Sequence, residues 1–157
     1  MASSSERLDD IDIKILRLLQ QNARLTLKEI GSQVNLSSTP VYERFRRLER
    51  EGYIKKYVAV LDEEKLNMGL TVYCSVKLRQ QTLEQSEMFA KVISEIREVT
   101  ECYNISGQND FLLKIQAANM AAYREFVLHV LGAMDQVWSY ESTFVMDTVK
   151  HDYGLTI

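Results

Sequence analysis

The chain has 157 residues, a formal net charge of −3 and 46% apolar residues. This length holds one ordinary domain or two small ones, and no apolar run approaches the roughly 20 residues of a membrane-spanning helix. The first ten residues, MASSSERLDD, contain no apolar signal region, so we expect an intracellular, cytoplasmic protein. Cys74 and Cys102 are the only cysteines, and their β-like apolar surroundings favour two reduced core thiols over a disulfide. His129 and His151 lie in unrelated contexts, so we expect neither a metal site nor a cofactor.

The charge is divided unevenly along the chain. Residues 1–60 hold 11 Lys and Arg against 8 Asp and Glu, whereas residues 61–157 hold 8 against 14. A mildly basic segment joined to an acidic one suits a protein whose first part touches nucleic-acid phosphates.

Residues 8–21 predict a first helix. Asp9 or Asp10 is the expected N-cap, and acidic residues favour the positive end of a helix. Apolar side chains recur at helical spacing: Ile11, Ile15, Leu18 and Leu19. Three short helices around one small core make a helix-turn-helix unit.

A second helix is predicted to begin at Thr26. Thr26 and Glu29 have the spacing of a capping box. Gly31 is a poor helix former whose missing side chain allows another backbone to come close. Asn35 tolerates a left-handed helix end, so residues 35–37 predict a tight turn.

The third helix follows the caps Ser37–Thr39 and is predicted to end at Gly52. Val41, Phe45 and Leu48 form its buried stripe. Its opposite side is polar and cationic, as a helix in the major groove requires. The alternative is a solvated face of an ordinary helical hairpin. The expected base-edge contacts are Ser38, Thr39, Tyr42, Glu43 and Arg46, and the expected phosphate contacts are Arg47, Arg50 and Lys55.

The segment after this helix predicts the domain boundary. Residues 53–61 have the pattern of a strand that begins as a wing and links to a second domain. Residues 62–69 are polar with a short helical bias. We therefore expect a DNA-binding domain over residues 1–61 and a second domain over 62–157.

From residue 70 the apolar period changes to two, which indicates half-buried strands. The predicted order is strand-helix-strand-strand-helix-strand, a ferredoxin-like βαββαβ fold, so the whole chain is α+β. The predicted strands are 70–78, 99–106, 110–116 and 137–149, and the predicted helices are 83–97 and 120–131. The inward side of helix 83–97 is expected to carry Phe89, Val92, Ile93 and Ile96. Apolar groups are expected on both faces of the predicted sheet, from residues such as Tyr73, Leu112, Trp138 and Phe144. The face without helices is therefore expected to bind a second copy of the chain. A monomer with ordinary surface aromatics is the alternative.

The segment Ser106–Asp110, SGQND, is the one stretch after residue 60 that indicates ligand chemistry. A glycine-led turn offers backbone N–H groups for a carboxylate, and Asp110 offers a partner for an ammonium group. An ordinary hairpin turn has the same spacing.

Three stretches resemble the Lrp/AsnC (feast/famine) family of bacterial transcription regulators: LDDIDIKILRLLQQNARLTLKEIG, LSSTPVYERFRRLEREGYI and CYNISGQNDFLLKI. The resemblance runs from Leu8 to Val149. It implies a winged helix-turn-helix domain that binds double-stranded DNA and a C-terminal domain that binds a free amino acid between subunits. It implies a homodimer that assembles further, to an octamer. The effector residues that it implies are Gly107, Gln108, Asn109 and Asp110 in the turn, with Tyr140 and Ser142 on the facing strand.

Two other classes of function compete with a regulator. An enzyme fits poorly, because the chain has no nucleophile pair, no paired carboxylates with a cleft and no phosphate-binding glycine loop. A winged-helix scaffold that binds proteins predicts no salt-dependent affinity for DNA.

Overall fold

The computed structural model describes residues 7–157, which form two compact units. The first contains the described residues up to Val60 together with Lys150–Ile157, and the second contains Leu61–Val149. Within the described residues, no helix is long and apolar enough to cross a membrane.

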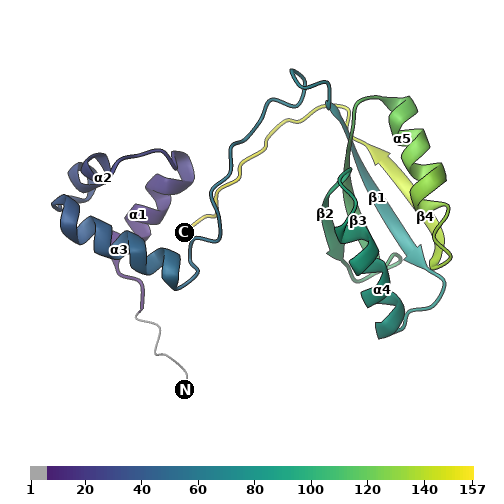
Figure 1. Ribbon diagram of the computed structural model, residues 1–157, viewed down its shortest axis with the longest axis horizontal. Helices are drawn as coiled ribbons and strands as arrows, with labels where there is room; N and C mark the ends of the chain where they lie inside the picture. The colour runs from purple at the N-terminus through teal and green to yellow at the C-terminus, as the bar shows by residue number, and fades with distance from the viewer. Residues whose placement is uncertain (1–6) are drawn as a thin grey trace. The chain divides into compact units, whose positions relative to one another are not determined.

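Three helices make the first unit (Figure 1), and their ends follow the predicted caps. Asp9 caps the first helix, and Thr26 and Glu29 form the predicted capping box at the second. Asn35, with φ 57°, ends the second helix in the left-handed conformation, which opens the tight turn. The helices are α1 (Asp10–Gln21), α2 (Leu27–Val34) and α3 (Ser38–Arg50).

The core of this unit joins one stripe from each helix. Ile15 of α1, Ile30 of α2, and Val41 and Leu48 of α3 have no exposed surface. Phe45 packs against this cluster and is partly buried. The predicted buried stripe of α3 is therefore confirmed, and its opposite side faces away from the core.

The predicted strand over residues 53–61 is wrong. Gly52 has φ 77°, as expected for the end of α3, but residues 55–62 that follow are extended without strand pairing. A strand needs a ladder partner for its N–H and C=O groups, and no segment of the described residues pairs with this one. Val58, Val60 and Leu61 are accordingly exposed.

Residues 150–157 at the C-terminal end pack within the first unit. There the side chain of Gln20 in α1 makes two hydrogen bonds to the backbone of Leu155. Its Nε2 donates to the carbonyl oxygen, and its Oε1 accepts from the N–H. Arg17 donates through Nε to the carbonyl oxygen of Ile157. The final residues of the chain are therefore held on α1.

The second unit is a four-stranded antiparallel sheet with the order β2-β3-β1-β4. Together with its two helical crossovers, this order is that of the expected ferredoxin-like fold. The elements are β1 (Leu70–Leu78), α4 (Leu83–Ser94), β2 (Val99–Asn104), β3 (Phe111–Ala117), α5 (Met120–Phe126) with a following π-helical turn (Val127–Leu131), and β4 (Val137–Phe144).

Both helices cover the same face of this sheet (Figure 1). Phe89 and Ile93 of α4 and Tyr123 and Phe126 of α5 pack on alternate residues of the strands. The predicted inward position of Val92 is wrong, because it is 42% exposed. Helix α4 and strand β4 end three and five residues before the predicted limits.

The other face of the sheet is more polar than predicted. Lys114 pairs there with Glu101 at 3.3 Å, and Gln116 bonds to Thr71 at 3.0 Å. Phe144 is not on this face, because it pairs in register with buried Val72 and meets Tyr123 edge to face.

The two cysteines are free, but only one is in the core. Cys74 of β1 is buried, and burial raises the pKa of its thiol to about 11. Cys102 lies on β2 at the edge of the sheet and is exposed, so its predicted core position is wrong.

Candidate functional site

The side of α3 that faces away from the core carries most of the expected DNA contacts. Ser38, Thr39 and Tyr42 are exposed near its N-terminal end, together with Glu43. The Arg46 side chain is 61% exposed. Arg50 and Lys55 are exposed as well. Arg47 is the exception, because only 18% of its side chain is accessible.

A groove of about 970 Å³ runs along the basic side of α3. One wall is this basic side of α3, and the other is the N-terminal end of α1. Its lining residues are Arg7, Asp9, Asp12, Pro40, Tyr42, Glu43, Arg44, Arg46, Arg47 and Arg50. Five arginines and three acids meet in this groove, so cations dominate its field.

Glu49 lies near the C-terminal end of α3 and contacts two other side chains. It accepts a bond from Arg46 at 3.0 Å through Oε2 and one from the Tyr57 hydroxyl at 3.2 Å through Oε1. Tyr57 also stacks on Phe45. Burial raises the pKa of Tyr57 to about 12, and the charge of Glu49 adds to this rise. The Arg46–Glu49 ion pair is exposed and therefore weak, so Arg46 is free to leave it for another partner.

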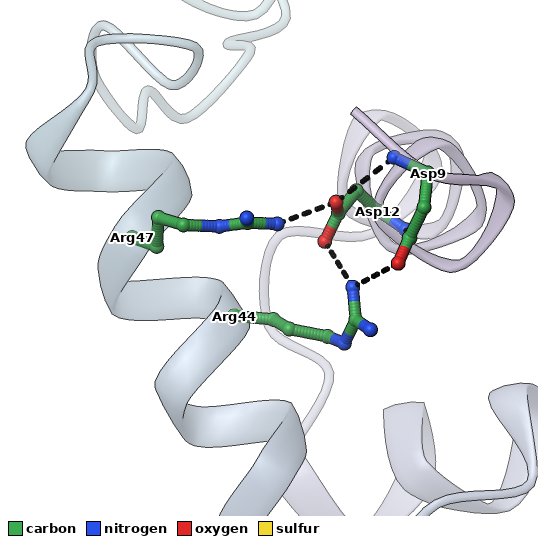
Figure 2. Close-up of polar contacts among 4 residues, drawn as sticks. All are labelled: Asp9, Asp12, Arg44 and Arg47. Carbon is green, nitrogen blue, oxygen red and sulfur yellow. Dashed lines mark hydrogen bonds and ion pairs between the residues drawn. The ribbon is translucent and has the colours of Figure 1, made fainter. Parts of the chain in front are cut away.

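A buried carboxylate joins α3 to α1 (Figure 2). Asp12 has no exposed surface. Its Oδ1 accepts from Nη1 of Arg44 at 2.8 Å, and its Oδ2 accepts from Nη2 of Arg47. Arg44 also reaches Oδ2 of Asp9 at 2.7 Å. Both arginines thus extend from α3 towards the first turn of α1.

The N-cap of α1 and this ion-pair cluster use the same two carboxylates, those of Asp9 and Asp12. The backbone N–H of Asp9 donates to Oδ2 of Asp12 at 3.1 Å, and the N–H of Asp12 donates to Oδ1 of Asp9 at 2.9 Å. The N–H of Asp12 is the main reason that the pKa of Asp9 is lowered. The bond to Asp12 raises the pKa of Arg44. The charged forms of Asp9 and Arg44 are therefore favoured.

Sequence reasoning missed Asp12 and Arg44, although a signal was present. Asp12 stands three residues after Asp9, which is capping-box spacing, and three before Ile15. A carboxylate on the apolar stripe of a helix needs a cationic partner.

The expected ligand turn lies at the end of the second unit where β1 ends and β4 begins. Asp110 accepts from the backbone N–H of Leu78 at 2.7 Å and from Nε2 of Gln81 at 2.8 Å. Its own N–H donates to Val76 at 2.9 Å. Gly107, with φ 137°, is exposed, as is Gln108, and Asn109 is half-buried. The Asp110 carboxylate therefore ties the turn to the loop after β1.

Tyr140 and Ser142 lie on β4, on the other side of β1 from this turn. Tyr140 is opposite Val76, the residue that Asp110 contacts, and is 40% exposed. Ser142 is opposite Cys74, and its hydroxyl is 2.5 Å from that of Tyr123. Tyr140 thus shares the level of the turn, and Ser142 lies deeper, beneath α5.

A cation lies at this same end of the sheet, which sequence spacing did not show. Arg79 follows Leu78 and donates through Nε to the carbonyl of Asp135 at 2.9 Å. Its guanidinium lies 5.2 Å from the centre of the Trp138 ring, which is 64% exposed. Only the pairing of β1 with the start of β4 brings Arg79 and Trp138 together.

Two family models match the chain. The model of the Lrp/AsnC ligand binding domain matches residues 71–155, which is more than half of the sequence, and a winged helix-turn-helix DNA-binding model matches residues 8–55. The chain belongs to the Lrp/AsnC family. The winged helix-turn-helix class is thereby confirmed, although residues 51–69, which lie between α3 and β1, form no strand.

Lrp/AsnC regulators also resemble the chain over nearly its whole length. The DNA-binding transcriptional activator DecR of Escherichia coli is 35% identical, over 96% of this chain and 99% of DecR. The leucine-responsive regulatory protein of Escherichia coli is 36% identical, over 96% of this chain and 92% of the relative. A transcriptional regulator of Neisseria meningitidis, solved in complex with L-Met, has a TM-score of 0.91 and 36% identity, over 95% of this chain and 96% of that one.

These relatives settle the class of function. They are transcription regulators, so the chain is a DNA-binding regulator with a ligand-binding domain, and the enzyme alternative is wrong. Within the described residues, no three His, Cys, Asp or Glu side chains are grouped as a metal site would need.

Proposed function

We propose that this Lrp/AsnC regulator recognises a specific operator with the exposed side of α3, in the cytoplasm, where bacterial DNA lies. The exposure of this polar, cationic side next to an arginine-lined groove carries the proposal. Residues 1–61 contact DNA, and residues 62–157 bind the effector and join subunits. Base edges are contacted by Ser38, Thr39, Tyr42, Glu43 and Arg46, because the first turns of a recognition helix reach deepest into the groove.

Phosphates are contacted by Arg50 and Lys55. Both lie beyond the first turns of α3, and both are exposed. Arg47 is on the same border of the helix, but its guanidinium is engaged by Asp12. A phosphate contact by Arg47 therefore requires it to leave a buried partner.

Arg46→Ala will weaken binding to the operator by about 1–3 kcal/mol and relax base preference at one position. Arg50→Ala will weaken operator and random DNA equally and flatten the salt dependence. Fluorescence anisotropy with a duplex selected from a random pool, and with an unselected duplex, measures both. Equal losses on the two duplexes for Arg46→Ala would contradict a base contact.

We also propose that the ligand is a free amino acid, bound between subunits at Gly107–Asp110, Tyr140 and Ser142. The regulator of Neisseria meningitidis that resembles this chain was solved with L-Met, which supports an amino acid here. The ammonium group contacts Asp110. Two bonds from Leu78 and Gln81 leave acceptor capacity on this carboxylate, because a carboxylate has about four lone-pair sites.

Arg79 supplies the partner for the ligand's carboxylate, beside the amides of Gln108 and Asn109. Its backbone follows Leu78, the residue that Asp110 holds. Its Nε donates to the carbonyl of Asp135, and its guanidinium lies over the Trp138 ring, which leaves Nη1 and Nη2 for the ligand. An arginine oriented in this way binds a carboxylate with two parallel bonds.

The assembly that completes the site is a homodimer that associates further, to an octamer. Two recognition helices in one dimer match a palindromic operator with half-sites one or more helical turns apart. The face of the sheet without helices carries Tyr73 and Leu112 among its polar groups, and supplies the contact surface. A ligand bound between subunits stabilises one assembly over another.

At least one free amino acid, with L-Met tested first, will release or absorb heat in titration calorimetry and change the mass measured by light scattering. Asp110→Ala will abolish the heat. Arg79→Gln will weaken binding on the order of tenfold or more, because a charge-assisted bond contributes about 1.5–3 kcal/mol.

Arg97→Gln is the matched control. Arg97 is exposed just before β2 begins, at the other end of the sheet from the turn. Its removal changes the charge equally and will leave the ligand affinity unchanged. No heat with any of the twenty amino acids at millimolar concentration would end the effector proposal.

A further inference from the structure

Arg47 is the expected DNA contact whose position differs from all the others. The exposed fraction of its side chain is 18%, against 61% for Arg46 on the same helix. Its guanidinium points along the groove wall to α1, where it meets the buried carboxylate of Asp12 (Figure 2). A base-facing or phosphate-facing arginine would extend into solvent instead.

The position of Arg47 on α3 explains how it can serve either partner. At 100° per residue, Arg47 lies roughly 60° from Arg44, between the buried stripe and the DNA side. Arg44 lies nearer the core and is bound twice, to Asp9 and to Asp12. Arg44 is therefore a fixed anchor, whereas Arg47 lies closer to the exposed, polar side of α3.

We propose that Asp12 is a positioning residue for DNA recognition, which holds Arg47 away from the phosphates and so limits sequence-independent binding. Asp12 accepts three hydrogen bonds while fully buried, from Arg44, Arg47 and the backbone of Asp9. Arg44 fixes that carboxylate, and the carboxylate fixes Arg47. Each recognition helix thereby presents Arg46 and Arg50 to DNA and withholds one further cation.

The consequence is a bias in favour of the operator. Phosphate contacts strengthen binding to all DNA alike, whereas base contacts discriminate. A cation that a buried acid retains adds nothing to random binding. The inference rests on the proposed placement of α3 against DNA.

The test is the salt dependence of binding to a random-sequence duplex by the full-length protein. Each phosphate contact contributes about 0.9 to the slope of log affinity against log salt. Arg50→Gln will lower the slope by about 0.9 per bound recognition helix, whereas Arg47→Gln will lower it by less than about a third of that. Both variants lose one positive charge and leave Asp12 paired with Arg44.

Asp12→Asn removes the buried charge that holds Arg47 without changing the shape of the buried side chain. It will tighten random binding on the order of tenfold at 0.1 M salt and steepen the slope by about 0.9 per helix. In the Asp12→Asn background, Arg47→Gln will now lower the slope as much as Arg50→Gln does. Asp10→Asn is the control, because Asp10 is exposed in the same turn of α1 and changes the charge equally.

The outcomes separate the inference from the function on which it rests. Equal slope losses for Arg47→Gln and Arg50→Gln in the parent protein overturn the inference, and this comparison needs no substitution of Asp12. Equal slopes for Asp12→Asn and Asp10→Asn overturn it too, because a purely structural Asp12 changes stability and not the slope. If neither Arg47→Gln nor Arg50→Gln lowers the salt slope, the placement of α3 on DNA is contradicted.

Discussion

Asp12→Ala will lower the free energy of unfolding of the first unit by about 2–4 kcal/mol, because Arg44 and Arg47 each lose their ion pair with this buried carboxylate. This value is set below the usual range of about 3–5 kcal/mol, since the side chains of Arg44 and Arg47 retain 27% and 18% of their surface in water. The variant also loses the bond from the backbone of Asp9 to Oδ2. Hydrogen exchange measured by mass spectrometry will show faster exchange in α1–α3.

Two comparisons show whether loss of the buried ion pairs is the cause. Asp10→Ala removes an exposed acid from the same turn and will cost less than about 1 kcal/mol, the value of a charge at a helix N-terminus. Replacing Asp12 with Leu together with Arg44 and Arg47 with Met will recover most of the loss, because apolar groups of similar size need no partners. A triple variant as unstable as Asp12→Ala would refute this explanation.

Gly31→Ala will weaken operator binding on the order of tenfold by displacing the turn before α3. A Cβ at Gly31 would lie 2.5 Å from the carbonyl oxygen of Leu36, which is backbone and cannot rotate away. The N–H of Leu36 donates to the carbonyl of Gly31 at 3.0 Å, so the same contact closes the turn. Separating these segments moves the first turn of α3, where base edges are contacted.

The stability of Gly31→Ala will fall less than its DNA affinity. Overpacking costs about 1–3 kcal/mol, and about 1 kcal/mol of it is offset because alanine favours a helix. Ser32→Ala places the same residue on the exposed side of α2 and will leave both properties unchanged. Anisotropy on the operator and urea unfolding measure the two. Parent-like operator affinity for Gly31→Ala would show that the turn tolerates the added methyl group.

Local sequence signals determined the helix ends and the close approach at Gly31. Thr26 with Glu29, Asn35 and Gly52 act on N–H and C=O groups within a few residues, so their effect is independent of the rest of the chain. The buried stripe of Val41 and Leu48 follows from the period of the helix alone. In the same way, the alternation of apolar and polar residues predicted the strands of the second unit.

Pairing between distant segments decided what these signals left open. Residues 53–61 have strand composition, but a strand exists only where a partner accepts its hydrogen bonds, and among residues 7–157 no segment pairs with them. The prediction that Val92 faces inward was also wrong, because the sheet beneath α4 decides which side of the helix is buried.

The roles of individual charges were the least predictable from sequence. The helical period places Arg47 on the border of the DNA side, and only the packing of α1 on α3 shows that Asp12, 35 residues earlier, engages it. Asp110 was predicted in its turn, but the sheet decides that Leu78 and Gln81 occupy its carboxylate. The sequence by itself determined which faces are apolar, basic or capped, because these depend on neighbours within one or two turns. The tertiary structure decided which charges meet, because ion pairs join residues that only folding brings together.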